Sequence, residues 1–259
     1  MAGGKRPGFL GQERDGPGLT FLLIALVVIA VAGARFFGFN PAKTRQAAPS
    51  AQVTAPQAEV AKGEVLPVLI YAAHPSENYS PREPHAKGEG DVVTIVEVLA
   101  GHLTEAKVPV KVIGDIKAAP WGEAFEAARL ALLPAINAAG RIGAIIDIHR
   151  DALEDKPPGY TTVMVGGQAT AKILLVVGDL ENPYVHENLI FAERLKNELE
   201  ALAPGICRGV KVLHQAVNGD LHPNAVQVHI GDYYDNDINE ARLGTAVLAK
   251  AIVRVLGGV

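Results

Sequence analysis

The sequence predicts an α/β domain with a mostly parallel twisted sheet covered by helices on both faces, preceded by one N-terminal transmembrane helix and a flexible linker. Apolar runs of strand length alternate with longer stretches in which apolar residues recur every three or four positions. Strands buried on both sides consist of unbroken apolar runs, and their alternation with helices is typical of a parallel sheet. One much longer apolar run, near the N-terminus, stands apart from this pattern.

This long run, Leu19–Ala32 (LTFLLIALVVIAVA), forms the centre of 19 consecutive uncharged residues. About 20 apolar residues span the hydrocarbon of a bilayer. Residues 19–38 are therefore predicted to be a membrane anchor that follows an N-terminal tail, residues 1–18. A cleaved signal peptide is the alternative, because Ala32-Gly33-Ala34 has the small-x-small form of a cleavage site. Lys and Arg are balanced on the two sides of the run, so charge does not predict its orientation.

The segment after the apolar run, residues 39–62, is rich in Ala, Pro, Gln, Ser and Thr. It shows no apolar periodicity, which predicts a flexible linker. Residues 63–259 then form one predicted domain, long enough to bury a sizeable core. This domain has a formal net charge of −8, whereas residues 1–62 carry +4. An acidic domain argues against nucleic acid as a partner, since phosphate binding requires a basic surface.

Strands and helices alternate within the predicted domain. The strands are expected at Val65–Tyr71, Val108–Gly114, Ala144–His149, Thr161–Val165, Ala171–Gly178 and Ala225–Gly231. The fourth of these is expected at an edge or in a hairpin, with Gly166-Gly167 as a turn. The helices are expected at Asp91–Glu105, Gly122–Ala139, Tyr184–Ala203 and Asn236–Val255. The third helix is marked by Pro183 before its start and by Pro204-Gly205 at its end.

Polar residues gather where several predicted strands end, which is where open α/β sheets place reactive groups. His74 and Glu77 follow the first strand, His149 ends the third, and His229 lies on the last. Since the chain has a single cysteine, Cys207, a metal ion would have to be held by His, Asp or Glu. His74, Glu77 and His149 form a two-His-one-carboxylate set. Such a set suits a catalytic zinc ion because it leaves one position for a water molecule.

Each of these residues also has an ordinary structural explanation. A histidine at the end of a strand often makes hydrogen bonds within the core without binding a metal ion. Asp147, two residues before His149, is either a partner that fixes the imidazole ring or a loop acid. Arg150 and Asp151 equally suit a surface ion pair. The sequence contains no nucleophile elbow, phosphate-binding loop, dinucleotide fingerprint or HExxH motif.

Three stretches of the chain resemble a known family. They are Ile70–Tyr79, Asp147–Ala152 with Ala171–Ala192, and Pro204–Ala241. Together they resemble the stage II sporulation protein P family, which is similar to the zinc-dependent N-acetylmuramoyl-L-alanine amidases. The resemblance covers nearly all of residues 65–259. It implies an N-terminal membrane segment, a variable linker and a C-terminal amidase domain.

The resemblance also implies an activity, which is zinc-dependent hydrolysis of the amide between the muramoyl lactyl group and the first stem alanine of peptidoglycan. His74, Glu77 and His149 would be the zinc ligands. Further residues expected around the metal or the substrate are Asp147, Arg150, Asn188, Asn218 and Asp220. The protein would be a single-pass cell-membrane protein with an extracytoplasmic catalytic domain, acting in sporulation-associated wall remodelling with a lytic transglycosylase as its partner.

Two positions depart from the family pattern. The first motif usually has an earlier histidine where this chain has Ala72. The last strand usually presents a glutamate general base where this chain has His229. A histidine can accept a proton from water, but as a fourth zinc ligand it would close the site. Three interpretations remain: an amidase with His229 as its base, a catalytically degenerate relative that binds the wall or a partner, and a zinc carboxypeptidase with the same ligands.

Overall fold

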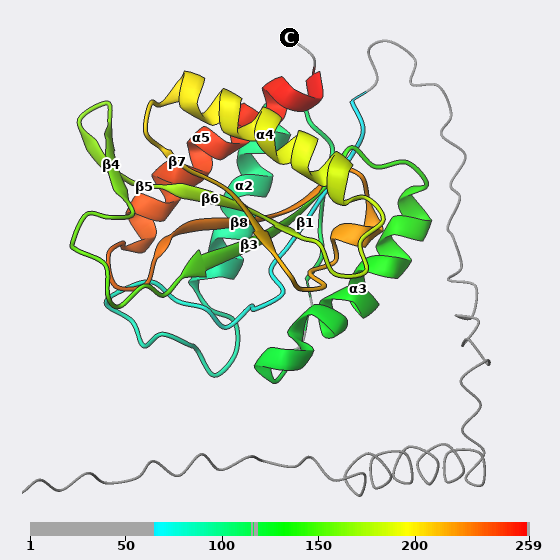
Figure 1. Cartoon of the computed structure of the whole chain (residues 1–259), viewed down its shortest axis with the longest axis horizontal. Coiled ribbons are helices and arrows are strands. Elements are labelled where there is room, and N and C mark those ends of the chain that lie inside the picture. The colour runs from blue at the N-terminus through cyan, green and yellow to red at the C-terminus, as the bar shows by residue number, and fades with distance from the viewer. Residues whose placement is uncertain (1–64, 115, 117–118, 258–259) are drawn as a thin grey trace, which may run out of the picture. The chain divides into compact units, whose positions relative to one another are not determined.

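The computed structural model describes residues 65–114, 116 and 119–257. The predicted anchor at residues 19–38 and the linker at residues 39–62 lie outside the described residues. Among the described helices, none is both long enough and apolar enough to cross a bilayer. The described chain forms a six-stranded sheet, a two-stranded hairpin and four α-helices (Figure 1).

The structure contains every strand and helix that the sequence predicted within residues 65–257, with bounds that differ by a few residues. The strands of the large sheet are β1 (Val68–Tyr71), β2 (Val110–Val112), β3 (Ala144–Asp151), β6 (Ile173–Gly178), β7 (Cys207–Leu213) and β8 (Ala225–Asp232). The hairpin consists of β4 (Thr162–Val165) and β5 (Gln168–Ala171), joined as predicted by Gly166-Gly167. The helices are α2 (Asp91–Glu105), α3 (Ala124–Ala139), α4 (Val185–Leu202) and α5 (Ile238–Gly257), with short 3₁₀ turns η1 (Trp121–Glu123) and η2 (Gly219–Leu221).

Two strands, β5 and β7, were not predicted. β7 lies at an edge of the large sheet, and its residues are half-buried or exposed. An edge strand does not need an unbroken apolar run, and Gly209 and Lys211 interrupt the apolar residues of β7. Its sequence therefore lacks the pattern by which the buried strands were recognised.

The order of the strands in the large sheet explains where a cleft can form. The order is β2-β1-β3-β8-β6-β7, and every neighbouring pair is parallel except β6 and β8, so the sheet is mostly parallel, as predicted. The chain passes from β1 through α2 to β2, and then returns through α3 to β3 on the other side of β1. Right-handed connections in opposite directions place α2 and α3 on opposite faces of the sheet. The ends of β1 and β3 then form a topological switch point, where such sheets bind ligands.

Alternate residues of the strands face two separate cores. Ile146 and Ile148 of β3 point into the larger core, which α2, α4 and α5 cover. Leu69 and Ile145 point to the opposite face, where they pack against α3. Helices therefore cover both faces, as predicted, although α3 is the only α-helix of the described chain that packs on the second one (Figure 1).

The second face becomes polar beyond the small core under α3. Ile145 belongs to this core. Two and four residues further along β3, the same face presents Asp147 and His149, opposite Gln227 and His229 of β8. We call Asp147, His149, Gln227 and His229 the polar row. It begins where the apolar side chains of the two strands end, close to the switch point.

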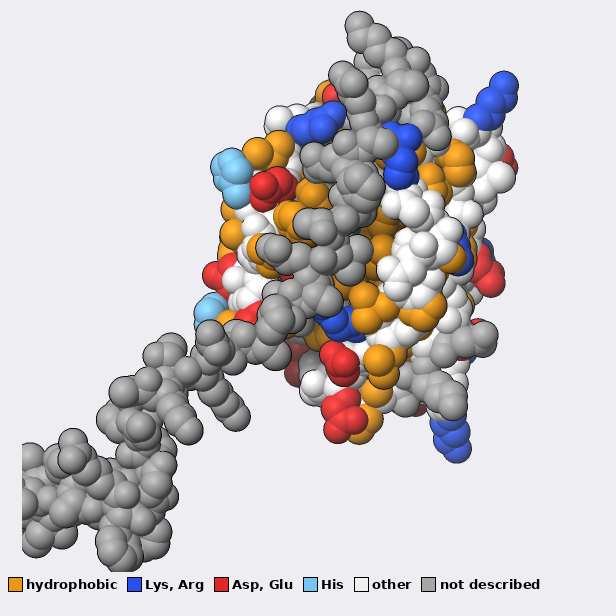
Figure 2. All heavy atoms as spheres, turned by 90° about the vertical axis from the view of Figure 1, so that its right-hand side faces the viewer, with side chains coloured by type: hydrophobic (Ala, Val, Ile, Leu, Met, Phe, Trp, Pro, Cys, Tyr) orange, Lys and Arg blue, Asp and Glu red, His pale blue; other side chains and the backbone are white. Residues whose placement is uncertain are grey.

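The outer surface mixes charged and apolar side chains. Figure 2 shows the right-hand side of the view in Figure 1, and on this face Lys and Arg lie interspersed with Asp and Glu. Hydrophobic atoms are exposed between them. The acidic excess of the domain is therefore not gathered into one patch on this face.

His222, which precedes β8, is a half-buried histidine outside the polar row. Burial lowers its pKa from 6.5 to about 4, although hydrogen bonds with the backbone of Asn224 and Ile142 act in the opposite direction. Between these two pH values the unfolded chain binds more protons than the folded one. The free energy of unfolding therefore rises with pH across this window, by up to about 3 kcal/mol for this group. In urea unfolding experiments, we expect the free energy of unfolding of His222→Gln to rise less between about pH 4 and 6.5 than that of the wild type. An equal rise in the two proteins would contradict this.

Candidate metal centre and active site

Three residues from neighbouring strands bring their donor atoms together at the switch point. His74 and Glu77 lie in the loop after β1, and His149 lies in β3, which pairs with β1. The Nδ1 atoms of His74 and His149 are 3.4 Å apart, and His149 Nδ1 is 3.7 Å from Glu77 Oε2. All three side chains are buried, and their donor atoms lie within 4.8 Å of one another. The fold thus brings the predicted ligand set together.

The separations of 3.4 and 3.7 Å are close to those between the ligands of a tetrahedral metal ion. Two ligand atoms that each lie about 2.0–2.2 Å from a zinc ion, at a tetrahedral angle, are separated by roughly 3.3–3.6 Å. Two imidazole nitrogens and one carboxylate oxygen are also a donor set of catalytic zinc sites, which keep a fourth position for water. Both the spacing and the chemistry of the donor atoms therefore suit zinc.

Asp147 lies behind His149, on the side away from the other two donors. Asp147 Oδ2 is 2.9 Å from His149 Nε2, and Asp147 Oδ1 accepts a hydrogen bond from Ala73 N at 2.9 Å. The Gln227 amide nitrogen is 3.3 Å from the same ring nitrogen of His149. A carboxylate in this position fixes the ring so that its other nitrogen faces the metal. The contact with His149 favours this role for Asp147 over that of a loop acid.

The carboxylates around His149 favour a positive charge at this place. Burial alone would lower the pKa of His149, but Asp147 and Glu77 outweigh it and raise the pKa to about 10. Burial alone would raise the pKa of Glu77, but its contact with His149 and the charge of Arg150 lower it instead. The same field attracts a divalent cation, which would displace the proton because a ligating imidazole is neutral.

The loop between β1 and α2 holds Glu77 through main-chain hydrogen bonds. Gly90 N donates to Pro75 O at 2.7 Å, and Val92 N donates to Glu77 O at 3.1 Å. These bonds tie the start of α2 to the segment that carries the donors. The carboxylate of Glu77 also accepts a hydrogen bond from Arg150 N at 3.2 Å. The position of Glu77 therefore depends on both α2 and β3.

Gly90 lies where the loop passes closest to the donor segment. A Cβ atom at this position would lie 2.3 Å from Glu77 O and 2.6 Å from Ser76 O, so Gly90→Ala must displace the backbone that carries Glu77. We expect this variant to lose about 1–3 kcal/mol of unfolding free energy and to bind zinc about 10–100-fold more weakly. Gly88→Ala is the matched control, since nothing lies within 4 Å of a Cβ there. Calorimetric zinc titration and urea unfolding test this, and equal results for the two variants would contradict it.

Arg150 is buried and faces the loop between β1 and α2. Its Nε donates to Asn78 O at 2.9 Å, and its guanidinium also donates to Pro84 O at 2.7 Å. The guanidinium lies over the ring of Tyr233, 5.4 Å from its centroid. The alternative of a surface ion pair between Arg150 and Asp151 is therefore wrong. Arg150 fixes the loop that carries Glu77.

The three remaining predicted residues connect helices to the segment before β8. Asn188 of α4 donates to two backbone carbonyls of residues 222–223, at 2.8 Å each. Asp220 accepts two hydrogen bonds from the guanidinium of Arg129 in α3, at 2.9 and 2.7 Å. Asn218 donates to a carbonyl at the start of α3, at 2.9 Å. Their contacts hold α3 and α4 in place, so these residues support the site through the fold.

His229 lies beside the donor group and is oriented by Asp151. Its Nδ1 is 2.8 Å from Asp151 Oδ1, and Asp151 also pairs with Arg208. Burial alone would raise the pKa of Asp151, but His229 and Arg208 lower it to about 2, so the carboxylate is ionised. An ionised carboxylate only accepts hydrogen bonds, so Nδ1 carries the proton and the lone pair of the neutral ring is on Nε2.

The surroundings of His229 leave its Nε2 available. This atom is buried and has no hydrogen-bond partner among the described residues. The ring stacks on that of His149, with centroids 5.2 Å apart. Within the described chain, however, the donor atoms that converge are those of His74, Glu77 and His149, without His229. This geometry suits a proton acceptor beside the metal better than a fourth ligand.

Several residues of the site were not predicted from the sequence. Gln227 lies two residues before His229, the same alternation that relates Asp147 to His149, so this spacing was a usable signal. Arg208 lies on β7, a strand that was not predicted, and no local pattern pointed to it. The ring of Phe125, at the start of α3, packs edge-on against His74 with centroids 5.3 Å apart.

Solved structures with this fold include amidases. The CwlD amidase from Clostridioides difficile, solved in complex with the GerS lipoprotein, is 11% identical with a TM-score of 0.53, over 75% of this chain and 100% of that one. The N-acetylmuramoyl-L-alanine amidase from Clostridium difficile 630 is 15% identical with a TM-score of 0.50, over 75% of this chain and 95% of that one. At these identities the likeness concerns the fold. No curated relative matches the sequence significantly.

The domain therefore has the fold of these amidases, and three potential metal donors converge in it. The sequence pattern of the stage II sporulation protein P family matches residues 38–253, which is most of the chain. The chain therefore belongs to the stage II sporulation protein P family, as the resemblance of its motifs predicted.

Proposed function

We propose that this protein is a zinc-dependent amidase, which hydrolyses the amide between the muramoyl lactyl group and the first stem alanine of peptidoglycan. The observation that carries the proposal is the convergence of His74, Glu77 and His149 at the switch point of the sheet, with Asp147 behind His149. Membership of the family and the amidase fold support the same reaction.

The residues of the site would have separate roles in this reaction. His74, Glu77 and His149 would hold the zinc ion, and Asp147 would keep the ring of His149 in place. A zinc ion supplies Lewis acidity, which lowers the pKa of a water molecule and polarises an amide carbonyl. Gln227, whose amide lies against both Asp147 and His149, would limit the movement of this pair.

His229 would carry the proton. Its Nε2 takes a proton from the water that attacks the amide carbon, and then delivers it to the nitrogen as the C–N bond breaks. The products are a lactyl carboxylate and a stem peptide with a free amine. Asp151 would hold Nδ1–H throughout, so that Nε2 stays the accepting atom.

The N-terminal sequence and the family suggest where the protein acts and in which cellular process. We infer that residues 19–38 anchor the protein in the cell membrane, that residues 39–62 are the linker, and that the domain acts outside the membrane on peptidoglycan during sporulation. A lytic transglycosylase would cleave the glycan strands of the same wall. Recovery of the full chain in the membrane fraction, and its loss on deletion of residues 19–38, tests the anchor.

Mass spectrometry of digested peptidoglycan tests the reaction itself. The full chain is incubated with purified peptidoglycan and zinc, with and without a chelator. We expect intact stem peptides with a free alanine amine, and no such products in the presence of the chelator. Release of single terminal amino acids would indicate a carboxypeptidase instead. No cleavage at all with zinc bound would indicate a degenerate wall- or partner-binding protein.

A further inference from the structure

Tyr160, in the turn before β4, is surrounded by three cationic side chains. The Lys156 ammonium and the Arg208 guanidinium lie 5.2 and 5.6 Å from the centroid of its ring. Lys172 Nζ donates to the carbonyl oxygen of Tyr160 at 3.2 Å. Arg208 pairs with Asp151, whereas no Asp or Glu of the described chain forms an ion pair with either lysine. We call Lys156, Lys172 and Arg208 the Tyr160 cation cluster.

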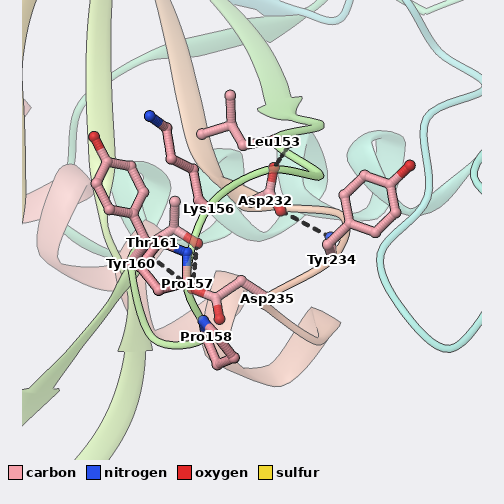
Figure 3. Close-up of a pocket in the computed structure, with 9 residues that line it drawn as sticks. All are labelled: Leu153, Lys156, Pro157, Pro158, Tyr160, Thr161, Asp232, Tyr234 and Asp235. Carbon is pink, nitrogen blue, oxygen red and sulfur yellow. Dashed lines mark hydrogen bonds between the residues drawn. The ribbon is translucent and has the colours of Figure 1, made fainter.

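Lys156 and Tyr160 line a pocket of about 80 Å³, while Lys172 and Arg208 contact Tyr160 from outside this lining. Figure 3 shows Tyr160 and Lys156 on one side of this pocket and Tyr234 on the other. The two tyrosines are 42% and 54% exposed, so the pocket opens to solvent between them. A pocket of this volume admits a group of a few heavy atoms, such as a carboxylate.

Two acidic side chains also line the pocket, but backbone amides engage both of them. Asp235 accepts hydrogen bonds from Gly159 N and Thr161 N, at 2.6 and 2.7 Å. Asp232 accepts hydrogen bonds from two further backbone amides, at 2.6 and 2.8 Å. These carboxylates hold the walls of the pocket in shape, and Lys156 is the cationic side chain of its lining, with Lys172 adjacent at the Tyr160 carbonyl.

A series of direct contacts joins the Tyr160 cation cluster to the candidate metal centre. Arg208 pairs with Asp151, Asp151 bonds to His229, and the ring of His229 stacks on that of His149. A substrate that extends from the metal centre toward Asp151 and Arg208 would approach the Tyr160 cation cluster.

We propose that the Tyr160 cation cluster is a carboxylate-binding subsite for the stem peptide, on the alanine side of the amide that is cleaved. The inference rests on the proposed amidase function. The peptide side of that amide carries carboxylates, whereas the hydroxyl and acetamido groups of the sugar side are neutral. Two ammonium groups without carboxylate partners match the charged side of the substrate.

An anionic lipid surface is the other ligand that exposed lysines can bind. The pocket favours the peptide, because a concave site between two tyrosines admits a single small group rather than a flat array of headgroups. The series of contacts that leads to His149 also favours a ligand shared with the metal centre.

Calorimetric titration with L-alanyl-D-glutamate, which has two carboxylates, and with its diamide tests the proposal on the full chain. We expect the free acid to bind more tightly than the diamide. In the double variant Lys156→Gln/Lys172→Gln, the Kd for the free acid should rise about five- to tenfold, while that for the diamide stays unchanged. Lys107→Gln/Lys111→Gln is the matched control, since it removes two exposed positive charges, one just before β2 and one within it, at the opposite edge of the sheet from β7.

Equal affinity of the wild type for the acid and the diamide would overturn the proposal. So would an unchanged Kd in the Lys156/Lys172 double variant with a wild-type circular dichroism spectrum. If that variant lost only its binding to phosphatidylglycerol vesicles, the subsite would be a membrane contact instead. Cleavage of muramoyl-alanine is measured separately. A wild type that binds the dipeptide through the lysines but cleaves nothing would retain the subsite and disprove the amidase function.

Discussion

His74→Ala and His149→Ala are each expected to abolish tight zinc binding, with a loss of affinity of more than about 100-fold. Each variant removes one of the three donors that converge at the switch point. Zinc at 100 times its Kd stabilises a folded protein by about 2.7 kcal/mol if it does not bind the unfolded chain. Neither variant should show this gain. Metal analysis of the purified proteins and thermal unfolding with and without zinc measure both effects.

Two further variants make the ligand test specific. His214→Ala is the control, because His214 is 79% exposed and pairs with Asp179 instead of the polar row. It should keep the full zinc content and the full stabilisation. Asp147→Asn keeps all three donors but loses the charge behind His149, so we expect an intermediate loss of about 10–100-fold. Full zinc stoichiometry in both His74→Ala and His149→Ala would refute the ligand assignment.

The ligand set could be predicted from the sequence because its signals are local. His74 and Glu77 directly follow an apolar strand, and His149 ends another. Parallel neighbouring strands must bring their carboxyl ends to the same edge of the sheet. The spacing of Asp147 and His149 on one strand similarly placed both side chains on one face. No long-range information was needed beyond the pairing of β1 with β3.

The surroundings of His229 could not be predicted in the same way. Its partner Asp151 lies just beyond a register shift between β3 and β8, which sequence alternation does not reveal. Arg208 reaches Asp151 from β7, whose half-exposed residues gave no strand signal. The sequence is equally compatible with Arg150 as a surface charge, since the loop carbonyls that it binds come from a segment some seventy residues earlier.

His229→Ala is expected to lower the rate of muramoyl-alanine cleavage by about 10²–10⁴-fold, which is the usual contribution of a general base. The variant should still bind one zinc ion, because His229 lies outside the converging donor group of the described residues. Loss of zinc together with activity would instead make His229 a fourth ligand. An unchanged rate would favour the degenerate interpretation, in which the last strand contributes no base.

His229→Glu restores the residue type that the family usually presents at this position, and we expect it to raise the rate of cleavage above that of the wild type. Asp151 would limit this gain in rate. Its ionised carboxylate lies 2.8 Å from the imidazole of His229 and would repel a glutamate at the same position. The double variant His229→Glu/Asp151→Asn removes this repulsion and leaves the donors of the metal centre in place. It should therefore be faster than His229→Glu alone. If both variants cleave no faster than the wild type with zinc bound, the histidine is not a weakened substitute for the glutamate base.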